Sequence, residues 1–320
     1  MSEHWAAAGH EVTVSTDVAK DLDAPYMGPA AVHHRPGPWE LFQLWKDHDV
    51  VVHMMVGLKS VWPAALRANP SVFAHQSTYW LDRSERRDWR EKLKLHIAAA
   101  NPWNICVSRF VREATVLRES VVVPNCYDDA IFWLDASVPR DREIVFVGRL
   151  VSDKGADLLL EAVSRCDGGK ALSVTIVGGG PEEAALRRQA VDLGVENVRF
   201  TGSLPPREVA DELRRHRLMV VPSLWREPFG IVALEGMACG AVPLVADGGG
   251  LPEAVGDAGM VFRRGDAEDL ALKLSQLLSS HERQQALRER AKSHLREFTA
   301  AKMCDAYLDM ALQAVNANKR

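Results

Sequence analysis

The sequence contains few cysteines, no long hydrophobic run and no excess of positive charge. Its five cysteines are far apart and include no Cys-x2-Cys pair, which argues against a disulfide framework and against a zinc site. No apolar stretch reaches the roughly 18 to 20 residues of a membrane-spanning helix, and Met1 is not followed by the pattern of a secretory signal. The formal net charge of −4 lacks the basic excess typical of nucleic-acid-binding proteins. We therefore expect a cytoplasmic protein with reduced thiols and no nucleic-acid partner.

The apolar pattern predicts two α/β domains. A chain of 320 residues with 47% hydrophobic residues is long enough to form two cores. Short β-rich runs alternate with helical patterns, and the predicted strands are 11–15, 50–54, 72–75, 105–108, 121–124, 144–148, 173–177, 198–201, 219–222, 242–246 and 260–262. Continuous apolar runs separated by helices are typical of parallel strands covered on both faces. Two doubly wound domains follow, with a boundary in the polar stretch 135–142.

Two carboxylates, Glu227 and Glu235, are separated by seven residues behind a predicted strand. Residues 218–222 predict this strand, and residues 229–239 predict a helix that ends at Gly240. In an open α/β sheet, ligands bind beyond the carboxyl ends of the strands, where helix N-termini favour phosphate groups. A carboxylate at such a place favours hydroxyl groups instead. Phosphate and hydroxyl groups together indicate a nucleotide sugar as the ligand.

This spacing resembles the Glu-x7-Glu motif of the retaining glycosyltransferases of the GT-B fold. Further segments are similar to that family in the same order, namely 107–108, 123–125, 146–155, 178–181 and 248–253. The resemblance covers nearly the whole chain. It implies two Rossmann-like domains that face each other across a cleft. It also implies transfer of a sugar from a nucleoside-diphosphate sugar to an acceptor hydroxyl, with retention of the anomeric configuration.

The resemblance also implies a division of labour between the domains. Residues 1–138 would bind the acceptor, residues 298–320 would pack back onto that domain, and residues 139–297 would bind the nucleotide sugar. The opening residues 1–12 resemble the second half of the family's first helix followed by its second strand. By this resemblance the sequence lacks the family's first strand and the glycine-rich turn after it, roughly 20 residues by ordinary element lengths. A late start codon, a degraded homologue or a substitute segment would each explain this.

Four residues are implied to act on the donor. Arg149 and Lys154 would neutralise the diphosphate as it leaves the sugar, with a surface ion pair as the alternative. Glu235 would accept hydrogen bonds from the ribose hydroxyls, and the alternative is a buried carboxylate paired with an arginine. Glu227 would contact the hydroxyls of the transferred sugar, or else be a solvated loop carboxylate.

Backbone groups and a histidine complete the implied site. Phe229, Gly230 and Ile231 would offer backbone N–H groups to the phosphate. His75 is similar in position to a family histidine that lines the cleft near the sugar, with a hydrogen-bonded core histidine as the alternative. The turn 178–180 lacks the Gly-x-Gly-x-x-Gly spacing, so we interpret it as mainly structural. The loop of Gly248, Gly249 and Gly250 is equally consistent with a donor contact and with none.

Residues 80–96 carry tryptophans and an excess of basic side chains. We consider two interpretations: peripheral contact with an anionic membrane or a charged acceptor, and a solvated helix with internal ion pairs.

No metal and no cofactor beyond the nucleotide sugar are expected, because no Asp-x-Asp motif stands at a suitable strand end. Two other functions remain open: a truncated or non-catalytic donor-binding homologue, and another sugar-nucleotide enzyme such as an epimerase or a glycogen-type synthase. The sequence leaves the nucleotide base, the sugar, the acceptor and the oligomeric state undetermined.

Overall fold

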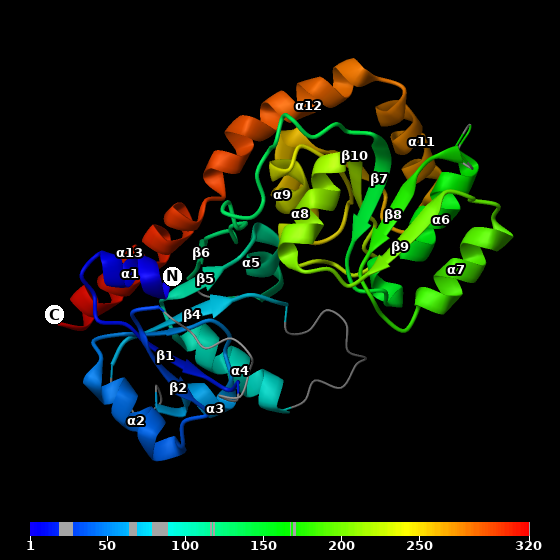
Figure 1. The fold of residues 1–320 in the computed structure, drawn as a ribbon. Coiled ribbons are helices and arrows are strands. Elements are labelled where there is room, and N and C mark those ends of the chain that lie inside the picture. The colour runs from blue at the N-terminus through cyan, green and yellow to red at the C-terminus, as the bar shows by residue number, and fades with distance from the viewer. Residues whose placement is uncertain are drawn as a thin grey trace. The chain divides into compact units, whose positions relative to one another are not determined.

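The computed structural model describes residues 1–18, 28–63, 69–78, 89–115, 117, 119–166, 168 and 171–319 (Figure 1). The chain divides into two compact units, Met1–Pro124 with Ala300–Arg320, and Asn125–Thr299. Every paired strand within the sheets of both units is parallel. The predicted doubly wound α/β fold class is therefore confirmed.

The second unit is built on one six-stranded sheet. Its strands are β7 (Arg142–Val147), β8 (Val174–Val177), β9 (Val198–Gly202), β10 (His216–Val221), β11 (Val242–Ala246) and β12 (Met260–Phe262). They lie in the order β12-β11-β10-β7-β8-β9. Strand interiors such as Ile144, Val145 and Leu244 are completely buried, because helices cover both faces of a parallel sheet. The six predicted strands of this half are all present, with their ends shifted by a few residues.

The helices of this unit are α6 (Ala156–Arg165), α7 (Glu183–Asp192), α8 (Pro206–Arg215), α9 (Ile231–Ala238), α10 (Leu251–Val255), α11 (Ala267–Leu278) and α12 (His281–His294). Short 3₁₀ turns are η2 (Ser152–Lys154), η4 (Gly256–Ala258) and η5 (Leu295–Glu297). Local signals set several helix starts. Asp266 caps α11 by accepting hydrogen bonds from the N–H groups of Glu268 and Asp269, and Pro206 occupies the first turn of α8.

The described residues of the first unit form two parallel sheets. One pairs β1 (Thr13–Thr16) with β2 (Ala31–His34), and the other has the order β3 (Val51–His53), β4 (Ser71–His75), β5 (Asn104–Cys106) and β6 (Val121–Val122). The helices are α1 (Ser2–Ala7), α2 (Pro38–Asp47), α3 (Leu58–Val61), α4 (Trp89–Ala100), α5 (Arg109–Thr115) and α13 (Ala300–Asn318). β2 was not predicted, because its short run of Ala-Val-His-His has no sustained apolar pattern.

The C-terminal helix α13 belongs to the first unit, where it packs against β4 and α1. Tyr307 is completely buried there, and its hydroxyl accepts a hydrogen bond of 3.1 Å from the Gln76 amide. The Trp5 indole donates to the Cys304 carbonyl at 2.9 Å. No helix in the described ranges is both long and apolar enough to cross a bilayer.

The predicted boundary after residue 138 falls inside the second unit, which begins at Asn125. Phe132 is buried in the core of this unit. The Arg214 guanidinium donates to the carbonyls of Ile131 and Trp133 at 2.9 and 3.0 Å. Residues 131–133 therefore pack into the second unit, although the polar residues that follow them are typical of a linker.

The strand order places a topological switch point between β7 and β10. From β7 the chain proceeds outward through β8 and β9, and then returns to β10 on the other side of β7. α6, which follows β7, packs against α7 and α11, whereas α9, which follows β10, packs against α8. The loops after β7 and β10 therefore diverge at the carboxyl edge of the sheet, where ligands of doubly wound proteins bind.

Candidate functional site

Two predicted site residues meet at the switch point. Lys154 ends the η2 turn after β7, and Glu227 lies in the loop after β10. Lys154 Nζ donates a hydrogen bond of 2.6 Å to Glu227 Oε1, and their side chains are only 21% and 17% exposed. Neither residue is thus a freely solvated surface charge.

Ser223 binds the same carboxylate oxygen of Glu227 that Lys154 binds. Ser223 lies two residues after the end of β10 and is only 2% exposed. Its hydroxyl donates a hydrogen bond of 2.8 Å to Glu227 Oε1. Lys154 and Ser223 therefore both bind Oε1, and Oε2 is the oxygen of Glu227 that they leave for another donor. Sequence reasoning missed Ser223. A small hydroxyl residue directly beyond a buried strand was the available signal.

The backbone keeps the two loops in contact. The N–H groups of Leu224 and Trp225 donate to the Asp153 carbonyl at 2.9 and 3.0 Å. Gly155, which follows Lys154, has a φ of 71°, and a Cβ there would lie 2.1 Å from the Pro222 carbonyl oxygen. Only glycine fits both the left-handed backbone and this close approach. The glycine after Lys154 is therefore required for the lysine to reach the β10 loop.

The loop of Gly248, Gly249 and Gly250 follows β11, the strand next to β10, and packs against the backbone of Glu227. The Gly250 N–H donates to the Glu227 carbonyl at 2.7 Å. A Cβ on Gly249 would lie 2.2 Å from that carbonyl oxygen, and one on Gly250 would lie 2.4 Å from the Pro228 carbonyl oxygen. Close packing against the backbone of Glu227 and Pro228 therefore accounts for glycine at positions 249 and 250 without any contact to a ligand. Contact of this loop with a donor stays a prediction.

The start of α9 faces the same loop. The helix begins after Gly230, whose φ is 109°, and no side chain caps it. A Cβ on Gly230 would lie 2.5 Å from Leu251 Cδ2, so a larger residue would displace the helix entry. Phe229 anchors the loop in the core, where its ring lies 5.7 Å from that of Phe298. The first-turn N–H groups are thereby held next to Glu227, and a helix start of this kind attracts anions.

Glu235 lies in the second turn of α9 and is partly buried. Burial, and then the nearby charge of Asp128, raises the pKa of its carboxyl from 4.5 to about 7. An arginine partner would lower this pKa, and none contributes to it. The arginine-paired alternative is thus not what the structure shows for the described residues.

The turn after β7 carries Arg149, which is exposed. The glycine turn after β8 packs against the backbone on both sides of Arg149. A Cβ on Gly178 would lie 1.8 Å from the Gly148 carbonyl oxygen, and a Cβ on Gly180 would lie 2.3 Å from the Leu150 carbonyl oxygen. The structural interpretation of the 178–180 turn is consistent with these contacts. Arg149 belongs to the same loop as Lys154, and its contact with a donor stays a prediction.

His75 has a different environment in the first unit. It ends β4, is completely buried, and its Nε2 lies 2.9 Å from Asn104 Oδ1. Burial lowers the pKa of its imidazole. This is the geometry of the core-histidine alternative. A sugar could touch the ring only after covering residues moved, so the cleft contact stays a prediction.

The basic segment 80–96 is only partly described. Residues 80–88 lie outside the described residues, and Trp89 begins α4 with an exposed side chain over which the Arg90 guanidinium lies at 5.5 Å. Contact of this segment with a membrane stays a prediction. Within the described ranges, no group of three or more His, Cys, Asp or Glu side chains is arranged to hold a metal ion.

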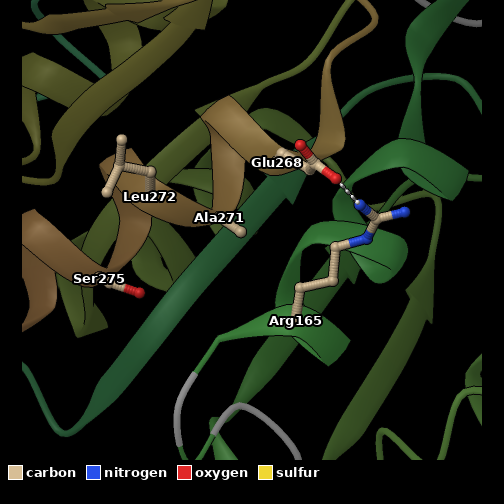
Figure 2. A pocket seen from close by; sticks show the side chains of 5 residues that line it. All are labelled: Arg165, Glu268, Ala271, Leu272 and Ser275. Atoms are coloured by element: carbon tan, nitrogen blue, oxygen red, sulfur yellow. Dashed lines mark hydrogen bonds and ion pairs between the residues drawn. The ribbon is translucent and has the colours of Figure 1, made fainter.

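A surface hollow elsewhere on the second unit contains none of these residues. It lies between α6 and α11, with Arg165 on one side and Glu268, Ala271, Leu272 and Ser275 on the other (Figure 2). The Arg165 guanidinium donates to Glu268 at 3.3 Å and also pairs with Glu161. Because its cation is already paired and exposed, we assign no function to this hollow.

The parallel sheets and the site at a switch point define a Rossmann-like α/β protein. The profile of the family described as "Glycosyl transferases group 1" matches residues 130–294, which is more than half of the chain. The chain therefore belongs to this family.

Sequence relatives agree with this assignment. The chain is 36% identical over 183 residues to D-inositol 3-phosphate glycosyltransferase of Nocardia farcinica, covering 53% of this chain and 40% of that protein. It is 28% identical over 200 residues to a glycosyltransferase of Methanocaldococcus jannaschii, covering 61% of this chain and 55% of that protein. The match thus spans about two fifths to just over half of the length of these relatives.

Solved structures share the fold. A glycosyltransferase from Rickettsia africae superposes with a TM-score of 0.78 at 16% identity, covering 98% of this chain and 93% of that one. Alr3699/HepE of Anabaena, solved in complex with UDP, gives a TM-score of 0.77 at 18% identity, covering 88% and 85%. Sucrose-phosphate synthase of Thermosynechococcus elongatus gives 0.73 at 20% identity, covering 99% and 90%.

Proposed function

We propose that this protein transfers a sugar from a nucleoside-diphosphate sugar to an acceptor hydroxyl with retention of the anomeric configuration. The observation that carries the proposal is the 2.6 Å contact between Lys154 and Glu227 beside the uncapped start of α9. It puts a cation and helix N–H groups, which suit a diphosphate, next to a carboxylate, which suits sugar hydroxyls.

Each residue has a distinct role in this proposal. The Lys154 ammonium and the Arg149 guanidinium bind the diphosphate, together with the N–H groups of Phe229, Gly230 and Ile231. Glu227 accepts hydrogen bonds from the transferred sugar through Oε2, while Ser223 holds Oε1. Glu235 accepts hydrogen bonds from the ribose hydroxyls. Membership of the glycosyl transferase family, and the Glu-x7-Glu spacing, support this distribution of roles.

The transfer breaks the bond between the anomeric carbon and the diphosphate oxygen, which keeps the electron pair. The acceptor hydroxyl oxygen forms the new bond to the same face of that carbon, and its proton passes to the departing diphosphate. Negative charge grows on the diphosphate as the bond breaks. Lys154, Arg149 and the start of α9 stabilise that charge more in the transition state than in the ground state, which lowers the barrier.

UDP-glucose is the first donor to test, because HepE of Anabaena was solved with UDP-glucose. Inositol phosphates come first among the acceptors, because the Nocardia relative is named for inositol 3-phosphate. Nuclear magnetic resonance of the product made from an α-linked donor gives the configuration at the anomeric carbon. An α-linked product supports the proposal, and a β-linked product contradicts retention. Donor binding without transfer to any acceptor would instead favour a non-catalytic donor-binding protein.

A further inference from the structure

A second cavity lies in the same unit, at the opposite edge of the sheet from Lys154 and Glu227. Its volume is about 280 Å³, and it is lined where β11 begins and where α9 ends. Because the strands are parallel, the start of β11 and the end of β10 are at opposite edges. The cavity is therefore separate from the proposed donor site, although α9 has one end at each.

Two arginines, Arg140 and Arg288, line this cavity. Arg140 donates to the carbonyls of Gly240 and Cys239, both at 3.1 Å. Arg288 of α12 donates to the same Gly240 carbonyl at 2.9 Å. Gly240 allows this convergence, because a Cβ there would lie 2.0 Å from Arg140 Nη2. Cations at a helix C-terminus are favourable, so part of their role is to cap α9.

Capping of α9 does not account for all of the positive charge that the arginines bring to this place. Arg217 is close to Arg288, which donates weakly to its carbonyl at 3.5 Å. The acceptors that these three guanidinium groups have among the described residues are neutral: backbone carbonyls and the side-chain oxygen of Gln284. Glu289 also lines the cavity, but it is paired with Lys292 at 2.7 Å.

This arrangement is electrostatically unfavourable. Burial, and then the charges of Arg140 and Arg217, lowers the pKa of the Arg288 guanidinium to about 10. Burial also lowers the pKa of Arg140. Partly buried cations without a counter-ion are costly, and an anion among them would relieve both the desolvation and the mutual repulsion.

The rest of the cavity wall is mostly apolar, with Leu134, Met237, Val242, Pro243, Leu287 and Leu295 among its residues. A free inorganic anion would leave this wall in contact with water. An anion that carries a short hydrocarbon group would cover it and would bury apolar surface at the same time.

We propose that this cavity binds a small amphiphilic anion, a phosphate or carboxylate joined to a short apolar group. The charged end lies against Arg140 and Arg288, and the apolar end lies against the side chains of α9, β11 and α12. This site is distinct from the donor site, and it does not depend on the proposed transfer reaction.

Butyl phosphate is the probe, and its binding to the full chain is measured by calorimetric titration. We expect saturable binding that is weaker by about tenfold or more in Arg288→Gln, since one charge-assisted hydrogen bond is lost. Arg283→Gln is the matched control, because Arg283 is on the same helix and is exposed. Binding in this variant should equal that of the wild type.

Ala136→Trp tests the site without touching the arginines. Ala136 lines the cavity and is exposed, so a tryptophan fills the mouth while the fold is kept. It should abolish butyl phosphate binding. Inorganic phosphate and butanol should each bind more weakly than butyl phosphate by about tenfold or more.

Three results would overturn the proposal. The first is no binding of butyl phosphate to the wild type. The second is equal binding of inorganic phosphate, which would show that the apolar wall contributes nothing. The third is binding that Lys154→Ala removes and Ala136→Trp retains, which would place the anion in the proposed donor site. Circular dichroism of each variant confirms that it is folded before its titration is compared.

Discussion

Glu227 Oε1 accepts hydrogen bonds from both Lys154 Nζ, at 2.6 Å, and Ser223 Oγ, at 2.8 Å. The lysine comes from the loop after β7, and the serine and glutamate come from the loop after β10. The contact thus joins the two loops that diverge at the switch point of the sheet. It fixes a cation and a carboxylate at the place where a doubly wound fold binds its ligand.

The first prediction concerns the coupling of this ion pair. A double-mutant cycle of Lys154→Met and Glu227→Gln should give a coupling free energy of about 1 kcal/mol, because the pair is partly buried and hydrogen-bonded. Urea unfolding of the two single variants and the double variant measures it. The exposed pair of Arg187 and Glu183 on α7 is the control and should give a smaller value. Equal values for the two pairs would mean that the Lys154–Glu227 contact is no more than a surface ion pair.

Ser223 should matter for turnover through Glu227. Ser223→Ala removes one hydrogen bond from the carboxylate, which is worth about 0.5 to 1.5 kcal/mol. We expect a two- to tenfold loss in kcat/KM, and no further loss when it is combined with Glu227→Gln. Ser293→Ala, an exposed serine of α12, is the control. Additive effects of Ser223→Ala and Glu227→Gln would show that the serine does not act through the glutamate.

Gly155 gives a direct test of the close approach between the two loops. Its φ of 71° matches the 72° of Gly202, but a Cβ on Gly202 meets no atom within 4 Å. Both alanine variants carry the cost of a left-handed residue, about 1 kcal/mol, and only Gly155→Ala adds the clash with Pro222. Gly155→Ala should therefore unfold at a clearly lower temperature than Gly202→Ala. Equal melting temperatures would contradict the described packing of η2 against the end of β10.

Glu235 predicts a pH dependence of stability. Its carboxyl has a pKa of about 7 in the folded chain against 4.5 for the unfolded reference, so the folded state holds its proton more tightly. The contribution of Glu235 to stability is therefore greatest below about pH 4.5 and is lost as the pH rises to about 7. Glu235→Gln should stabilise the protein at pH 8 relative to the wild type, and less so or not at all at pH 4.5.

Melting temperatures of the wild type and Glu235→Gln between pH 4.5 and pH 8 measure this difference. Glu208→Gln, at an exposed position of α8, is the control and should show no such trend. A difference between Glu235→Gln and the wild type that does not change with pH would contradict the raised pKa.

The sequence predicted the second unit well for a physical reason. Its central strands are buried on both faces, so each is a short, mostly apolar run such as Ile144–Val147. β2 offered no such run, because two of its four residues are histidines. The boundary was placed too late because the contact of Arg214 with Ile131 and Trp133 joins residues more than eighty positions apart. Local polarity carries no information about such a contact.

The site was predictable in part. The Glu-x7-Glu spacing and the lysine before Gly155 indicated which residues to examine. The sequence pattern did not indicate that Lys154 and Glu227 contact each other, because this contact depends on the adjacency of β7 and β10. The burial of His75 could not be read from its position after an apolar run either. Its ring faces Asn104 on the neighbouring strand β5, a pairing that only the sheet establishes.

The measurement that tests the central claim most directly is calorimetric titration with UDP, GDP, ADP and their sugar conjugates. It is made on the wild type, on Lys154→Ala and Glu235→Ala, and on Arg207→Ala as an exposed control in the same unit. The account predicts saturable binding of one nucleotide family, about tenfold or more weaker in Lys154→Ala and weaker in Glu235→Ala, and unchanged in Arg207→Ala. Binding that neither Lys154→Ala nor Glu235→Ala weakens, or no binding of any nucleotide, would contradict a donor site at this switch point.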